Sequence, residues 1–353
     1  MSETPRSEIL GPGDEPEGFG EGSRTPANDP KQIATCQPET RPFAPTLAVF
    51  ENPFPATEIV EPHSQAQSGE PPLFEYWLRP DTYPPARIPH LGHVCLLIVF
   101  ATFGLLGAVL LTRSALHFHL FGVSTVTEAA NDIQYALGNM AAIYLITFLA
   151  CLVFFPLVWH KGFFAGLQWH GATALRLRYR LLGAAFTCFV LAMIDEVLLP
   201  GPANAPIDKL FQTPREAWLL FAFGVTFAPF FEEMAYRGFL LPALATAWDW
   251  AIEQSTGRPP RPLDEDGHPQ WSMFAMVGAS IASSIPFALM HAEQTAHALG
   301  PFLLLVCVSL VLCWTRLATR SLAASVAVHS CYNFLLFSLM LLGTSGFKHM
   351  EKL

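Results

Sequence analysis

Apolar residues gather in seven runs along the chain, all beginning after residue 90. A membrane-spanning helix needs about 20 consecutive, predominantly apolar residues, and most of these runs approach or exceed that length. The pattern therefore predicts an all-α, polytopic helical membrane protein with about seven to eight transmembrane helices. The expected spans are Leu91–Leu111, Leu137–Trp159, Leu181–Leu199, a run from Ala217 to Trp250, Met273–His291, Phe302–Trp314 and Leu322–Leu342.

The fourth run is longer than one crossing and carries charged residues about halfway along it. Glu232, Glu233 and Arg237 lie between apolar stretches on both sides. Charges at membrane depth are costly and mark functional sites by default. On a helix, Glu233 and Arg237 are four residues apart and can pair, whereas Glu232 points about 100° away and is left for chemistry. Pro242, further along, predicts a kink.

The first 72 residues differ in composition from everything that follows. They contain twelve acidic and four basic residues, and so carry −8 of the chain's formal net charge of −9. A segment rich in Pro, Gly, Glu and Ser cannot bury enough apolar surface to fold alone. We therefore expect a disordered N-terminal tail, and the charge pattern predicts no nucleic-acid binding.

Basic residues lie mainly on one side of the predicted spans. With an internal N-terminus, the positive-inside rule is satisfied by a cytoplasmic set consisting of Arg79, Arg87, the cluster from Lys161 to Arg180, Arg258, Arg261, Arg316 and Arg320. Six of the seven cysteines fall in apolar runs, where they are interpreted as small buried hydrophobic residues.

Three more polar residues interrupt the last spans: His291, His329 and Asn333. Counting from the loop that joins their helices puts Glu232 and His291 at similar depth. His329 is shallower by the same count, and a tilted or broken helix would be needed to bring it level. Alone, each histidine is more often a packed residue, and Asn333 a link between helices. Together they suit the activation of a water molecule.

Three motifs occur in order: Glu232-Glu233-x-x-x-Arg237, Phe287-x-x-x-His291 and His329-x-x-x-Asn333. They resemble those of the CPBP intramembrane proteases, also called Abi, which include the type II CAAX prenyl endopeptidases. The resemblance implies a protease core and divides the chain into four parts. These are a tail and interfacial approach (1–88), a first transmembrane helix and loop (89–134), the CPBP-like core (135–343) and a C-terminal tail (344–353).

The resemblance also implies a role for each residue of the motifs. Glu232 would be the general base on the attacking water, helped by His291, and His329 and Asn333 would stabilise the tetrahedral oxyanion. The supporting residues would be Glu233, Arg237 and Phe287, with Glu233 and Arg237 pairing to hold the site in shape.

The sequence leaves open whether the site binds a metal ion. Glu232, His291 and His329 could form a zinc site, but there is no His-Glu-x-x-His motif to require one.

The sequence therefore predicts an intramembrane endopeptidase, a multi-pass protein of a bacterial cell membrane. It would be surrounded by membrane lipid and would act on a peptide or protein substrate, with lipidated substrates included. The main alternative is a transporter or channel that uses the buried Glu and His side chains for an ion or for protons. A third reading is a scaffold without catalytic activity.

Overall fold

The computed structural model describes residues 87–202, 213–264 and 268–348. Within these ranges, seven helices are long and apolar enough to cross a membrane, which confirms the predicted fold class and number of spans. Six of them are α2 (Leu91–His117), α4 (Ile133–Trp159), α7 (Arg178–Leu198), α11 (Met273–Met290), α12 (Leu299–Thr319) and α13 (Leu322–Gly343). The predicted tail lies outside the described residues, apart from its last two.

The seventh spanning segment, Pro214–Thr256, is one helical run of 43 residues. It is interrupted twice by π-helical turns, in which backbone hydrogen bonds join residues five apart. Its parts are α8 (Pro214–Ala222), the π-helical η4 (Phe223–Phe227), α9 (Ala228–Glu233), the π-helical η5 (Met234–Leu240) and α10 (Leu241–Thr256). π-Helical turns are rare and are frequently found at functional sites. The two carboxylates of the first motif lie between them.

Short polar signals set where the spans begin. The side chains of Asp132, Thr213, Ser272 and Ser321 each accept a hydrogen bond from a backbone N–H in the first turn of the following helix. Such N-caps satisfy donors that would otherwise be unpaired. Thr213 also forms a capping box with Glu216. These caps fix the register of the helices that carry the site.

Connections between the spans contain shorter helical elements. Between α2 and α4 lie a 3₁₀ turn, Leu120–Gly122, and α3 (Val126–Ala130), so the predicted polar loop is partly helical. Between α4 and α7 lie α5 (Phe163–Gly166) and α6 (Gly171–Arg176).

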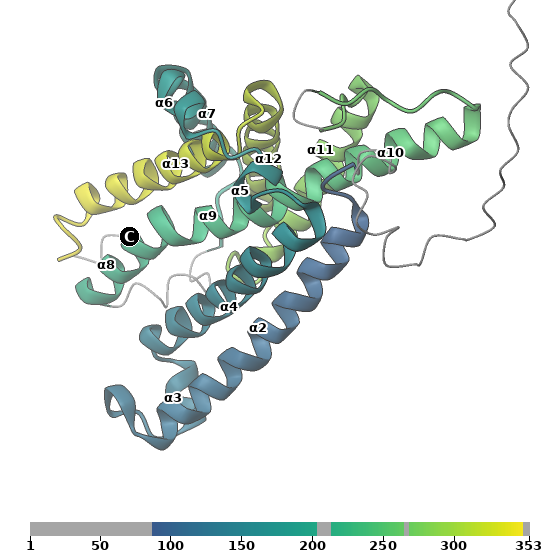
Figure 1. The fold of residues 1–353 in the computed structure, drawn as a ribbon. Coiled ribbons are helices and arrows are strands. Elements are labelled where there is room, and N and C mark those ends of the chain that lie inside the picture. Colours follow the sequence, from purple (N-terminus) through teal and green to yellow (C-terminus); the bar gives the residue numbers. More distant parts are fainter. Residues whose placement is uncertain (1–86, 203–212, 265–267, 349–353) are drawn as a thin grey trace, which may run out of the picture. The chain divides into compact units, whose positions relative to one another are not determined.

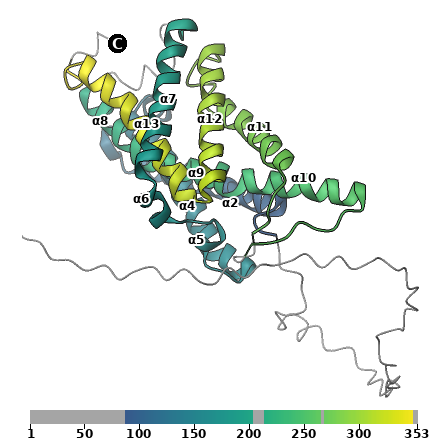
Figure 2. The same cartoon turned by 90° about the horizontal axis from the view of Figure 1, so that it is seen from above.

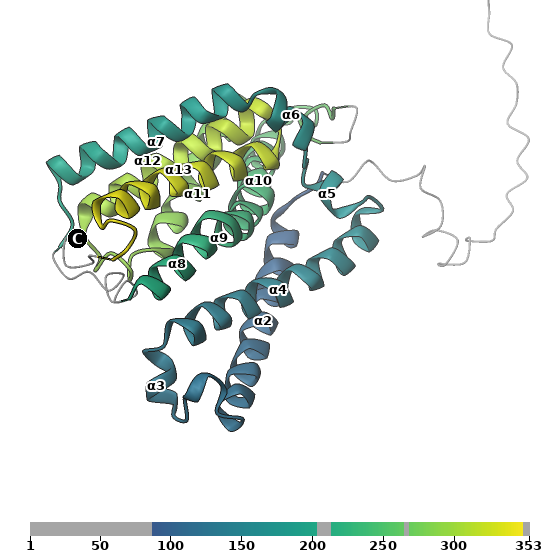
Figure 3. The same cartoon turned by 90° about the vertical axis from the view of Figure 1, so that its left-hand side faces the viewer.

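The helices pack in two neighbouring sets. α2 runs along α4 (Figure 1), and its face towards α4 is small at Gly104, where a Cβ would come within 2.8 Å of the Ile143 carbonyl oxygen. In the other set, α7, α12 and α13 lie side by side (Figure 3), with α11 against α12. The same grouping of α7, α12 and α13 is visible from above (Figure 2). The run that contains α9 contacts α13, and this contact creates the site.

Candidate active site

Three helices bring the residues of the three motifs together. Glu232 lies on α9, His291 directly follows α11, and His329 lies on α13. A carboxylate oxygen of Glu232 is 3.9 Å from Nε2 of His291 and 3.8 Å from Nε2 of His329. His329 is thus level with the carboxylate, despite its shorter distance in sequence from the end of its helix.

Glu233 and Arg237 form a fully buried ion pair, with 2.8 Å between Oε1 and Nη1. Nη2 of Arg237 donates to the side-chain and backbone oxygens of Ser309, at 2.7 and 3.1 Å. The guanidinium also lies 4.5 Å from the centre of the Phe287 ring. Breaking such a pair would leave an uncompensated buried charge, so these contacts hold α9, α11 and α12 in one arrangement.

The hydrogen bonds of the two histidines determine which ring nitrogen faces Glu232. Nδ1 of His329 lies 2.9 Å from the buried carboxylate of Glu233. Nδ1 of His291 lies 2.9 Å from the backbone oxygen of Phe287. Because a carboxylate and a carbonyl only accept hydrogen bonds, each Nδ1 carries the hydrogen. In the neutral rings both Nε2 atoms are therefore acceptors turned towards Glu232.

Asn333 lies one turn beyond His329, and its Nδ2 donates to the backbone oxygen of Gly224 at 2.8 Å. The π-helical register explains why that oxygen is available. The N–H of Ala228 bonds to the oxygen of Phe223, so the next residue, Pro229, would bond to Gly224. Proline has no N–H, and Asn333 supplies the donor instead. The same side chain also lines the cavity described next.

A cavity of about 360 Å³ adjoins these groups. Apolar residues of α4, α8, α12 and α13 form much of its wall. Its polar side chains are Glu232, His291, Gln294, Thr295, His329, Tyr332 and Asn333. Gln294, Thr295 and Tyr332 were not predicted as site residues. Gln294 and Thr295 follow His291 in a turn, and only their proximity to the Phe287-x-x-x-His291 motif could have pointed to them.

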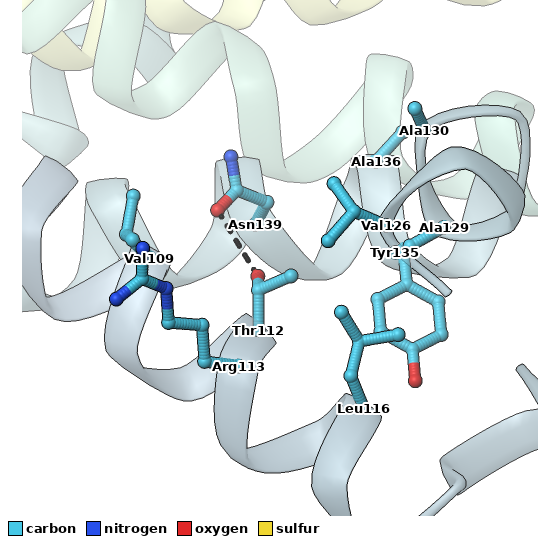
Figure 4. A pocket seen from close by; sticks show the side chains of 10 residues that line it. All are labelled: Val109, Thr112, Arg113, Leu116, Val126, Ala129, Ala130, Tyr135, Ala136 and Asn139. Atoms are coloured by element: carbon cyan, nitrogen blue, oxygen red, sulfur yellow. Dashed lines mark hydrogen bonds between the residues drawn. The ribbon is translucent and has the colours of Figure 1, made fainter. Parts of the chain in front are cut away.

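A second cavity, of about 410 Å³, lies between the ends of α2 and α4 and the short α3 (Figure 4). Its polar groups include Thr112, which hydrogen-bonds to Asn139 over 3.4 Å, and the cation Arg113. No carboxylate or imidazole is among its lining residues. Of these two cavities, the first is therefore the one with groups suited to acid–base chemistry.

The metal hypothesis can be tested against the donor set. No group of three His, Cys, Asp or Glu side chains within residues 87–202, 213–264 and 268–348 is arranged to hold a metal ion. Ligands at about 2.0–2.1 Å from a tetrahedral zinc would stand closer together than the 3.8 and 3.9 Å between Glu232 and the two histidines. The site as it stands does not fit a preformed zinc centre, and we assign no step to a metal.

These observations define an integral, multi-pass membrane protein whose spans enclose a carboxylate, two imidazoles and an amide at one cavity. Residues 214–335 match the model of a protein family described as type II CAAX prenyl endopeptidase Rce1-like. No match was found among curated proteins or among solved structures. The family match confirms the resemblance predicted from the motifs and supports a CAAX-type intramembrane protease in general.

The matched segment includes all seven residues predicted for the site. It is shorter than the predicted core of 135–343, and the extension of that core on either side stays a prediction. The match does not favour the transporter alternative, since the family it names is one of endopeptidases.

Proposed function

We propose that this protein is an intramembrane endopeptidase in which Glu232 activates a water molecule to hydrolyse a peptide bond. The observation that carries the proposal is the convergence of Glu232, His291 and His329 at one cavity, within a segment that matches an endopeptidase family. The amide of Asn333, on the wall of the same cavity, would suit an oxyanion, which forms in peptide hydrolysis and not in ion transport.

The spacing around Glu232 suits a shared water molecule. Separations of 3.8 and 3.9 Å are too long for direct hydrogen bonds. A water with ordinary bonds of about 2.7–2.8 Å to Glu232 and to either Nε2 would span such a separation with an angle of about 90° at its oxygen. The carboxylate and the neutral imidazole of His291 both accept hydrogen bonds, so together they hold such a water through its two hydrogens.

In the proposed reaction, Glu232 takes one proton from the water as its oxygen bonds to the carbonyl carbon of the substrate. The carbonyl becomes a tetrahedral oxyanion, to which Nδ2 of Asn333 donates. Glu232 then delivers the proton to the nitrogen of the leaving group as the C–N bond breaks. The products are a carboxylic acid, which then releases its proton to solvent or to the amine, and an amine. Each general acid–base transfer of this kind contributes about 10²- to 10⁴-fold to the rate.

The proposed role of His329 as an oxyanion donor depends on the protonation of its ring. Its Nδ1–H is engaged with Glu233, so Nε2 can donate to an oxyanion only when the ring is protonated. Glu233 provides the counter-charge for that imidazolium, as a buried carboxylate does for a catalytic histidine in general. Arg237 and Phe287 fix Glu233 in turn. Glu233 and Arg237 are fully buried and support the chemistry from behind the cavity wall, whereas Phe287 also lines the cavity itself.

The substrate we propose is a peptide or protein with a lipidated end, in keeping with the family description of a CAAX prenyl endopeptidase. The cavity supports this choice because its walls are mainly apolar, with Leu220, Leu304 and Phe337 among them. An extended peptide end beside a hydrocarbon chain would suit both its polar strip and its apolar walls. We propose a bacterial cell membrane as its location.

The test is cleavage of quenched peptides, with and without a prenyl group, by purified protein in detergent. Glu232→Gln should lower kcat by about 10²-fold or more, while the protein still inserts and elutes as the wild type does. The matched control is Glu293→Gln, because Glu293 is a nearby glutamate whose side chain is 90% exposed. His291→Ala and His297→Ala form a second pair of the same design.

Two results would contradict the mechanism. One is retained cleavage by Glu232→Gln, and the other is equal loss of activity in Glu293→Gln. A parallel series with a chelator decides whether a metal takes part, since loss of activity that only one metal restores would require a site that binds it.

A further inference from the structure

Arg316 lies on α12 and is 3% exposed. It is not part of the three motifs and does not line the cavity beside Glu232. The sequence placed it on the cytoplasmic side, beyond a span expected to end at Trp314, whereas α12 continues past it to Thr319 and the side chain is buried. Its Nε donates to the backbone oxygen of Arg237 at 3.3 Å. Its Nη2 donates to Oε1 of Gln168 at 2.8 Å and to the backbone oxygen of Leu167 at 3.4 Å.

The backbone oxygen of Arg237 requires a donor for the same reason as that of Gly224. The N–H of Leu241 bonds to the oxygen of Tyr236, five residues earlier. In that register the next N–H would bond to Arg237, but the next residue is Pro242, which has none. A buried carbonyl without a partner is destabilising. Arg316 supplies the missing hydrogen bond, as Asn333 does at the other π-helical turn.

Arg316 is thereby connected to the site through one residue. It holds the backbone of Arg237, whose side chain holds the carboxylate of Glu233. That carboxylate in turn orients His329. We propose that Arg316 is a positioning residue for hydrolysis, which sets the π-helical turn η5 and, through Arg237, the placement of Glu233 and His329. This inference rests on the proposed endopeptidase function.

Gln168, which accepts a hydrogen bond from Arg316, connects this part of the structure to α13, the helix that carries His329. Gln168 is buried and has φ of +55°, a left-handed conformation that is uncommon for residues other than glycine. Its backbone oxygen accepts from the N–H of Leu322, the first residue of α13. Leu322 is two helical turns before His329. One buried cluster therefore fixes both the turn that carries Arg237 and the start of the helix that carries His329.

The proposal is tested by changing Arg316 in two backgrounds. Arg316→Met should lower kcat about 10- to 100-fold with little change in KM, since small displacements of catalytic groups have effects of that size. Pro242→Ala restores an N–H that can bond to Arg237. In the Pro242→Ala background, Arg316→Met should therefore lower kcat by less than about threefold, because the two changes act on one hydrogen bond and are not additive.

Arg316→Lys, which retains a donor, serves if the methionine variant does not fold. The matched control is Arg320→Gln, four residues further on, where the side chain is 62% exposed and pairs with Asp264. It should leave kcat unchanged. An equal loss from Arg316→Met with and without Pro242 would overturn the proposal, and so would an equal loss in Arg320→Gln.

A second readout needs no substrate and separates this inference from the proposed function. Amide hydrogen exchange of residues 234–240 should accelerate at least tenfold in Arg316→Met and return towards the wild-type rate when Pro242→Ala is added. Unchanged exchange in Arg316→Met would overturn the positioning role, whether or not any peptide is cleaved. Absence of cleavage by the wild type would instead count against the endopeptidase function alone.

Discussion

The buried pair of Glu233 and Arg237 permits a quantitative prediction. Arg237→Met removes the 2.8 Å contact to Glu233, both hydrogen bonds to Ser309 and the contact with the Phe287 ring. It leaves a carboxylate with no solvent exposure, one oxygen bonded to His329 and the other without a hydrogen-bond partner. Removal of one partner from a buried ion pair costs about 3–5 kcal/mol, and we expect a loss of this size in the free energy of unfolding.

The double variant Glu233→Met/Arg237→Met separates two causes of destabilisation, the loss of side-chain contacts and the burial of a carboxylate without its cation. It removes more side-chain contacts than the single variant but leaves no unpaired charge of the pair. Buried ion pairs replaced by apolar residues of similar volume are often tolerated. We therefore expect the double variant to be more stable than Arg237→Met by about 2 kcal/mol or more, since breaking a buried pair costs about 3–5 kcal/mol and replacing the whole pair is often neutral.

The assay is unfolding of the purified protein in mixed micelles with increasing SDS, followed by circular dichroism. A loss below about 1 kcal/mol in Arg237→Met would refute the reasoning, since surface pairs rather than buried ones have values of that size. A double variant less stable than the single one would refute it as well, because the destabilisation would then come from lost packing.

Two further predictions concern positions outside the site. A Cβ on Gly300 would collide with the backbone oxygen of Leu199, at the end of α7, so Gly300→Ala should destabilise the protein by about 1–3 kcal/mol. Gly183 has no atom within 4 Å of the position of a Cβ, so Gly183→Ala should leave the stability unchanged in the same unfolding assay. Burial lowers the pKa of His268 from its usual 6.5, so the folded protein binds that proton less readily than the unfolded chain, and stability is retained above pH 6.5 and lost as the pH falls below it. Unfolding measured at pH 7.5 and 5.5 should show a smaller difference for His268→Gln, and an identical difference would contradict the assignment.

Much of the architecture could be predicted from the apolar runs alone. Their lengths gave seven spans because the requirement to cross a bilayer is nearly independent of tertiary contacts. The pairing of Glu233 with Arg237 followed from helical spacing, which a π-helical turn beginning just after Glu233 does not remove. The ends of the spans were less certain, and α2 and α12 each extend several residues beyond the predicted limits.

Other features depend on contacts that the sequence does not display. Counting residues placed His329 too shallow, since the count takes no account of how α13 packs against α9. The burial of Arg316 was missed because a basic residue next to a predicted span end is usually a loop charge, whereas here it bonds to Arg237 on another helix. The π-helical turns could not be predicted either, although Pro229 and Pro242 mark the carbonyl groups that they leave open.

These two prolines have a consequence for the fidelity of assembly. Each creates an acceptor on the long helical run that only a side chain from a different helix can satisfy, Asn333 at one end and Arg316 at the other. If α13 slid along the run by one turn, both the oxygen of Gly224 and the amide of Asn333 would lose their partner within an apolar interior. In lipid, one apolar helix face can replace another against a neighbouring helix at little cost. These two hydrogen bonds between helices therefore select one register among many that are otherwise similar in energy.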